Sequence, residues 1–248
     1  MTAPLLAERM VYRSGRYFVV NKLPGEAVEG GRAGMADLPP LLQALSPGAD
    51  IPPLPAGETP IPPRAVNRLD VPVSGLCLFA RTREAFIRAS EQFRERTTEK
   101  RYWAIVEPPL SGPLPVPEGR EMVKISHWLV EDPRQNRSVA HDKKVPGGKY
   151  ARLYCRAAGR GDRYLFLEIL LVTGRHHQIR AQLRRLGLCV KGDLKYGARR
   201  SEKNGGIRLH ASSLHFDDGD RARLFAPPPV MDRLWEACAA AIAGMPPS

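Results

Sequence analysis

Apolar residues along the chain fall into short runs divided by Gly, Pro and polar turns, a pattern that predicts several strands and few helices. Residues 11–22 indicate a hairpin with its turn at Ser14-Gly15. The run at 76–80 is continuously apolar and indicates a buried strand that follows a tight bend at Ser74-Gly75. Further strands are expected at 100–107, 149–156, 164–172, 207–216 and 221–225, the second and third of them paired.

Three helices are predicted. Thr82 is placed to cap a helix over 83–96. A second helix over 176–186 follows the tripeptide Thr-Gly-Arg, and a third over 230–244 ends the pattern. The first is expected to pack through Phe86, Ile87, Ala89 and Phe93. In the second, Ile179, Leu183 and Leu186 share one face, while a basic face that can border a cleft holds His177, Arg180 and Arg184.

Two segments lack a regular pattern. Residues 30–63 are rich in Pro and Gly, so we expect a surface excursion that cannot pair as a sheet, with one helical turn near 41–45. Residues 110–148 are turn-rich and receive no assignment. Strands that outnumber helices in a mixed order predict an α+β fold with a mixed, mostly antiparallel sheet flanked by helices. The length of 248 residues fits one domain, and we expect a single domain over 1–248.

Charge adds a partner to this picture. The chain has 38 Lys and Arg against 26 Asp and Glu, a net charge of +12, which favours a polyanion such as nucleic acid over no partner at all. A generally basic protein without such a partner stays open. The four cysteines are far apart and give no zinc or redox motif. No signal peptide or membrane span is apparent, so we expect a cytoplasmic protein without a metal site.

Two stretches carry candidate chemistry. Arg68 and Asp70 precede the buried run at 76–80, and residues two apart in a strand share a side. They are either a structural ion pair or a cleft acid with a basic neighbour. In the second stretch, His177 and Arg180 fall in the first turn of a helix, where anions bind readily.

Five ordered motifs resemble those of the RluA-type pseudouridine synthases. NRLDVPVSGL is similar to the catalytic motif H-R-L-D-x-x-T-S-G-L of that family, and TGRHHQIR with a downstream GDLKYG is similar to its T-G-R-x-H-Q-[IL]-R and G-D-x-x-Y-G segments. FVVNKLPGEAV, FRERTTEKRYWAIVE and LHASSLHF resemble further motifs in the same order. The resemblance covers residues 11–229 and implies one catalytic domain with a central basic cleft, without the N-terminal accessory RNA-binding domain of many relatives.

The resemblance also implies roles for individual residues. Asp70 aligns with the catalytic aspartate, Arg180 with the arginine that pairs with it, and Tyr102 with the tyrosine that stacks on the target base, for which we expect an exposed ring. RNA contacts are expected from Asn67, Arg68, Arg175, His177 and Arg184. The chain departs from the family pattern at Asn67, where His is usual, and at Val73, where Thr is usual. We expect these two changes to alter local hydrogen bonding, and we expect Asp193 and Tyr196 to form a turn.

Isomerisation of uridine to pseudouridine needs no redox change, so we expect no cofactor. The implied partner is RNA, in the form of a tRNA or ribosomal RNA stem-loop whose target uridine leaves its stack. We expect a monomer. The alternative is a non-catalytic RNA-binding paralogue on the same fold, motivated by Asn67 and Val73. A metal-dependent nuclease using His176, His177 and Asp70 is disfavoured, since adjacent histidines on a helix point to different sides.

Overall fold

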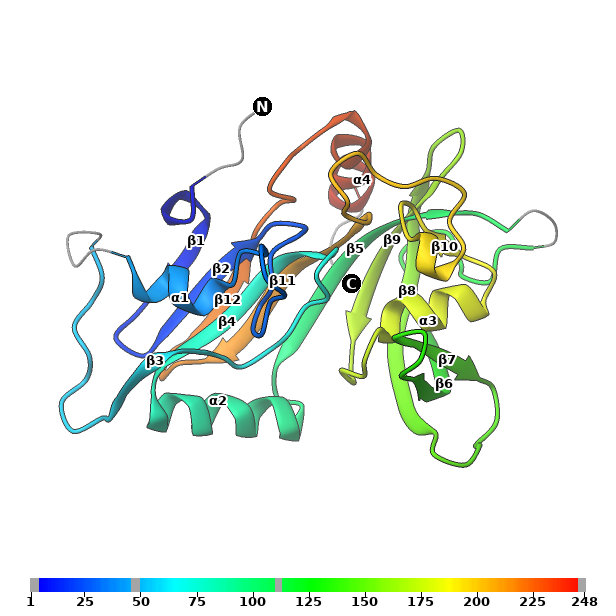
Figure 1. The fold of residues 1–248 in the computed structure, drawn as a ribbon. Helices are drawn as coiled ribbons and strands as arrows, with labels where there is room; N and C mark the ends of the chain where they lie inside the picture. Colours follow the sequence, from blue (N-terminus) through cyan, green and yellow to red (C-terminus); the bar gives the residue numbers. More distant parts are fainter. Residues whose placement is uncertain (1–4, 46–49, 110–112, 245–248) are drawn as a thin grey trace. The chain divides into compact units, whose positions relative to one another are not determined.

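The computed structural model describes residues 5–45, 50–109 and 113–244 (Figure 1). The chain divides into two compact units, which are described separately. The first consists of Met1–Glu99 with Ala211–Val230, and the second of Lys100–His210 with Met231–Ser248. A single catalytic domain over 1–248 stays a prediction.

Strands of the first unit follow the order β1-β2-β4-β11, with β3 also paired to β4 and β12 also paired to β11. The strands are β1 (Met10–Arg13), β2 (Tyr17–Lys22), β3 (Pro60–Ala65), β4 (Ser74–Thr82), β11 (Leu209–Asp217) and β12 (Arg221–Phe225). The helical elements are η1 (Ala7–Arg9), α1 (Leu38–Gln43) and α2 (Arg83–Glu95). The predicted hairpin is confirmed, since β1 and β2 pair antiparallel.

The alternating side chains of β4 build two layers of core. Leu76, Leu78 and Ala80 pack toward α2, and Cys77 and Phe79 pack toward α1. The predicted cap of α2 is confirmed, because Thr82 Oγ1 accepts a hydrogen bond from the Ala85 N–H at 3.1 Å. Ile87, in contrast, is 48% exposed, so its predicted place in the packing face of α2 is wrong.

Two predictions for the first unit need correction. The Pro-rich segment does pair as a sheet: β3 runs antiparallel to β4, with a register shift between Pro60 and Arg64 that lets prolines lie where no N–H is needed. The bend expected at Ser74-Gly75 is also absent, since both residues lie within β4. Gly75 is required there by a φ of +123° and by the Ala211 backbone, whose oxygen would lie 2.4 Å from an added Cβ.

The second unit has the strand order β5-β9-β8-β6-β7, with the short β10 also paired to β5. Its strands are β5 (Glu99–Glu107), β6 (Val123–Asp132), β7 (Arg137–His141), β8 (Lys149–Arg160), β9 (Leu165–Leu171) and β10 (Cys189–Val190). Its helical elements are α3 (Gln178–Arg185), η2 (Leu194–Tyr196) and α4 (Arg233–Ala243). The predicted pairing of β8 with β9 is confirmed, and β6 and β7 occupy the stretch that received no assignment.

Helices cover both faces of this second sheet. α4 packs through Trp235 and Cys238 on a cluster that includes Trp103, Ile105 and Phe166. α3 packs on the opposite face, where Ala181 meets residues of β6, β7 and β8. The pairs β2–β4, β5–β9 and β6–β8 are antiparallel, which together with the helices confirms the predicted α+β fold. In the part of the chain that the structure describes, no helix is long and apolar enough to span a membrane.

Candidate functional site

Asp70 lies in the connection between β3 and β4, at the first position of a tight turn. The Val73 N–H donates to the Asp70 carbonyl at 2.9 Å, which closes the turn. The turn is fastened to the end of β2, since the Gly25 N–H donates to the Val71 carbonyl at 2.8 Å. The carboxylate-bearing residue is therefore held by its own backbone and by the chain that follows β2.

The Lys22 side chain also joins the Asp70 turn to the chain around β2. The side chain is fully buried, and its Nζ donates to the carbonyls of Leu23, Glu26 and Val71 at 2.8, 3.0 and 3.0 Å. Burial lowers the pKa of Lys22 to about 8, partly opposed by nearby acidic groups that include Asp70. An ammonium ion thus lies behind the Asp70 turn and joins it to β2.

A buried ion pair supports Lys22 from the other side. Arg9 and Glu26 form a bidentate pair with N–O distances of 2.7 and 2.9 Å, and both residues are 7% exposed. Glu26 also accepts the Leu23 N–H at 2.8 Å, which fixes the turn that begins at Lys22. Buried pairs of this bidentate geometry are rigid as well as strong. The sequence analysis identified neither Lys22 nor this pair.

Arg180 occupies a comparable position in the second unit. It lies on α3 and is 4% exposed, whereas Arg184, predicted on the same basic face, is exposed. The guanidinium binds Asp193 through two bonds, Nε to Oδ2 at 2.6 Å and Nη2 to Oδ1 at 2.8 Å. It also lies over the Tyr196 ring, 4.8 Å from the ring centre. Asp193 and Tyr196 do form the η2 turn as predicted, but they also hold Arg180.

A polar network continues from Tyr196. Its hydroxyl accepts the Ser138 N–H at 2.8 Å and lies 3.1 Å from His177 Nδ1. His177 is 8% exposed and caps α3 in a left-handed conformation, with φ at 51°. The rings of His176 and His177 stack at 3.9 Å, so the expectation that they point to different sides is wrong. The physical reason is that His176 precedes the helix and His177 leaves helical backbone geometry.

Tyr102 lies on β5 and faces the same side of the sheet as α3. Register pairs share a face, and Tyr102 pairs with Ile169, which pairs with Cys155 on β8. The same face of β8 continues with Leu153 and then Ala151, and Ala151 belongs to the cluster under α3. The ring of Tyr102 is 5% exposed, so the expected exposed ring is not what the structure has.

The remaining predicted contacts are on the surface. Arg68 is exposed in the first unit. Arg175 and Arg184 are exposed in the second, where Arg175 Nε donates to the Tyr150 carbonyl at 3.2 Å and Arg184 Nη1 lies 3.4 Å from Cys189 Sγ. The structure thus gathers Tyr102, His177 and Arg180 in one unit, while Asp70 and Arg68 belong to the other. The pairing of Asp70 with Arg180 stays a prediction.

The model of the RNA pseudouridylate synthase family matches residues 16–185 of the 248-residue chain. The chain belongs to this family. The match includes the Asp70 turn and all of α3, so the RluA-type motifs recognised in the sequence are confirmed.

Several relatives are similar to the chain along most of its length. A protein of Zymomonas mobilis described as an uncharacterized RNA pseudouridine synthase is 29% identical and covers 92% of the chain and 95% of its own length. The tRNA pseudouridine synthase C of Haemophilus ducreyi is 30% identical and covers 69% of the chain and 73% of its own length. The human RNA pseudouridylate synthase domain containing 4 has the same fold, with a TM-score of 0.70 at 19% identity, covering 96% and 94%.

Other relatives are longer. An uncharacterized RNA pseudouridine synthase of Chloroflexus aurantiacus is 37% identical over 62% of the chain, but the matched part is 43% of that protein. The corresponding share for a Bacillus subtilis relative is 48%. The chain therefore spans about half the length of these curated relatives.

The two departures of the chain from the family pattern have local explanations. The Asn67 side chain replaces a strand partner: its Oδ1 accepts the Leu78 N–H at 2.7 Å and its Nδ2 donates to the Leu76 carbonyl at 3.2 Å. Val73 is 2% exposed, and its N–H closes the Asp70 turn. An RNA contact by Asn67 stays a prediction.

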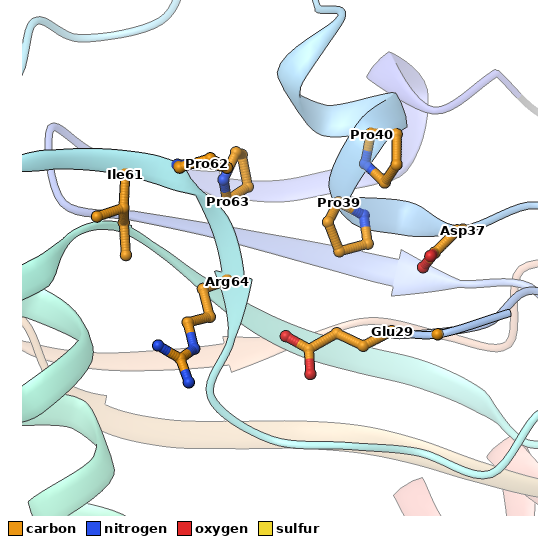
Figure 2. Close-up of a pocket in the computed structure, with 9 residues that line it drawn as sticks. Glu29, Asp37, Pro39, Pro40, Ile61, Pro62, Pro63 and Arg64 are labelled. Atoms are coloured by element: carbon orange, nitrogen blue, oxygen red, sulfur yellow. The ribbon is translucent and has the colours of Figure 1, made fainter.

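A shallow hollow of about 540 Å³ lies elsewhere in the first unit (Figure 2). It is lined by the Pro-rich segment and by the polar side chains of Glu29, Asp37 and Arg64. Glu29 is used to hold β3, since its Oε1 accepts the Ala65 N–H at 2.9 Å. None of the predicted site residues lines this hollow, so it is no part of the candidate site.

Proposed function

We propose that the chain is an RNA pseudouridine synthase that isomerises a uridine in a tRNA or ribosomal RNA stem-loop. The observation that carries the proposal is the Asp70 turn, whose backbone is fixed by Lys22. The turn lies within the residues that match the family model. A carboxylate held in this way is preorganised, which is what a catalytic group requires. The net charge of +12 supports a polyanionic substrate.

In the proposed reaction the target uridine is first extruded from its stack. The bond between ribose C1′ and uracil N1 breaks, and uracil leaves with the electron pair as an anion. The base then turns, C5 bonds to C1′, the C5 proton is lost, and N1 takes up a proton. No oxidant, reductant or outside group is consumed.

Asp70 is the proposed catalytic carboxylate, and it acts in one of two ways. It attacks C1′ as N1 leaves and is displaced when C5 bonds to C1′, or it removes the C2′ proton as N1 leaves to form a glycal and returns this proton when C5 bonds to C1′. A deuterium isotope effect with RNA labelled at C2′ identifies the second route, and its absence identifies the first. Arg180 is proposed to pair with Asp70, and Tyr102 to pack against the target base. The rigid holding of Arg180 by Asp193 supports the first of these two roles.

The decisive experiment replaces Asp70 with Asn. We expect D70N to lose pseudouridine formation while its affinity for RNA stays near that of the parent. A matched control is D162N, which changes the same groups in the exposed loop between β8 and β9 and is expected to keep full activity. Parent-level turnover by D70N would overturn the assignment.

The second candidate is a non-catalytic RNA-binding paralogue. Asn67 gives it little support, because its side chain is bonded to the backbone of β4. Mapping pseudouridine in total cellular RNA with and without the protein separates the two candidates. RNA binding with no modified uridine in either the parent or the control would favour the paralogue.

A further inference from the structure

One face of the β6–β8 end of the second sheet carries aromatic and basic side chains. Strand register places Lys124 opposite Tyr154, Ser126 opposite Arg152, and Trp128 opposite both Tyr150 and His141. Paired residues share a face of a sheet. We refer to this surface as the outer face and define it by six residues: Lys124, Trp128, His141, Tyr150, Arg152 and Tyr154.

The outer face is opposite the one that α3 covers. The alternate residues of β6 are buried under α3: His127 meets Gln182 at 3.1 Å, and Leu129 packs with Ala181. α4 packs on the outer side of the same sheet, but at the far end of β8, where Gly159 lies against Ala241. Tyr150 is 39% exposed and Lys124 is also exposed, while the other four residues are half-buried.

Aromatic rings on the outer face are held in place. Trp128 and Tyr150 meet edge to face at 5.5 Å, and the Tyr150 hydroxyl donates to Ser126 Oγ at 3.0 Å. Lys144 lies over the Trp128 ring at 5.6 Å. A ring that is both fixed and exposed loses little conformational entropy when a base stacks on it, and such stacking tolerates any base.

Charge on the outer face is positive. Lys124, Lys144 and Arg152 lie on it or beside it, and the Nε atoms of Arg152 and of Arg137, which continues the face on β7, are buried with no hydrogen-bond partner among the described residues. A buried donor without an acceptor is rare. Asp132, which shares this face, is occupied in accepting the N–H groups of the hairpin turn that follows it. Guanidinium donors without acceptors beside fixed rings suit the phosphates and bases of a nucleic acid.

We propose that the outer face binds an unpaired RNA segment, with bases stacked on Tyr150 and Tyr154 and phosphates held by Lys124 and Arg152. The proposal rests on the proposed function in taking RNA as the partner. It goes beyond that function because the outer face is on the opposite side of the sheet from Tyr102 and Arg180. RNA held there lies outside the candidate site within this unit.

The test measures equilibrium binding of a fluorescent oligoadenosine of about 16 nucleotides to the full chain. This RNA has no uridine, so its binding is independent of isomerisation and of D70N. We expect Y150A to weaken binding about tenfold and Y150F, which keeps the ring, to bind like the parent. We expect K124A to lower the slope of log affinity against log salt by about one.

The matched control is K149A, which removes the same charge from the other face of the same sheet, where Lys149 pairs with Glu131 at 2.8 Å. We expect it to bind like the parent. Equal weakening by K149A and K124A would mean that net charge alone binds RNA, and parent affinity in Y150A would mean that the ring takes no part. Either result overturns the proposal. A change of oligomeric state in Y150A with unchanged RNA affinity would also overturn it, in favour of a protein partner. Circular dichroism and thermal unfolding verify that each variant is folded.

Discussion

Replacement of Asp193 tests whether the buried pair with Arg180 holds that guanidinium in place. Both side chains are almost fully buried, 4% exposed for Arg180 and 2% for Asp193, and two hydrogen bonds of 2.6 and 2.8 Å join them. Removing one partner of such a pair leaves a buried charge and costs about 3 kcal/mol or more of unfolding free energy. For a chain of this size, that loss lowers Tm by about 6–12 °C.

Four proteins suffice for the measurement: the parent, D193L, R180M and the double variant R180M/D193L, each unfolded in urea. The double variant replaces the pair by apolar side chains and leaves neither charge without its partner. We therefore expect it to lose less stability than the sum of the two single variants, by about 2 kcal/mol or more. D162L, in the exposed loop between β8 and β9, is the control and is expected to unfold like the parent. Single losses that add up to the double loss would refute the reasoning.

The D193L variant can also be tested by its activity. If Arg180 acts on Asp70 as proposed, a shift of its guanidinium by about 1 Å lowers kcat about 100-fold. We expect KM for the RNA to change little, because Asp193 is buried and makes no surface for RNA. A rise in KM at constant kcat in D193L would show that the pair serves RNA binding.

Three further predictions concern the first unit. Burial lowers the pKa of Lys22 from 10.5 to about 8, so between these pH values the unfolded chain holds a proton that the folded chain has released. The unfolding free energy of the parent relative to K22M should therefore rise by up to about 1.4 kcal/mol per pH unit in this range. A difference that does not change with pH would contradict the burial. Burial would raise the pKa of Glu58, but hydrogen bonds from Thr82 and two arginines outweigh it and lower the pKa to about 2. The stability that these contacts give above pH 4.5 is therefore lost as the pH falls toward 2, and in urea unfolding E58Q should lose about 2 kcal/mol less than the parent over this range. Equal acid sensitivity of the two proteins would argue against the contacts. G75A should lower the free energy of unfolding by about 3 kcal/mol or more, because the added Cβ would meet the Ala211 backbone. G147A is the control, with a positive φ but open space around the added Cβ, and should lose about 1 kcal/mol. Similar losses for the two variants in urea unfolding would exclude the close approach as the cause.

Regular patterns in the sequence predicted the elements whose own residues determine them. The apolar runs of β4 and β9 and the Thr82 cap needed only local information. The Pro-rich β3 was wrongly excluded from the sheet, because proline lacks a donor but its carbonyl still accepts. The alternation of β6, with Ile125, His127 and Leu129 buried, was present in the sequence, and the turn residues around it obscured it.

Contacts distant in sequence could not be predicted in this way. The partner of Arg180 lies 13 residues away, beyond the end of its helix, and no periodicity joins the two. Lys22 ends a strand, a position where lysine is normally exposed, and only the tertiary structure puts three carbonyls around it. Sequence pattern therefore named the motif residues, while their supports came from the folded structure.

Buried charge alone does not distinguish those supports from ordinary structural pairs. Arg156 and Glu168 are also buried and paired at 2.6 Å, on the face of the second sheet opposite Tyr102. What sets Lys22 and Asp193 apart is the group at the other end of the bond: the backbone beside Asp70 in one unit and the guanidinium of Arg180 in the other. Apolar side chains often stabilise a fold as well as a buried ion pair does, but they cannot fix a carbonyl or a guanidinium in one orientation. The need for orientation, rather than for stability, accounts for charge at these two positions.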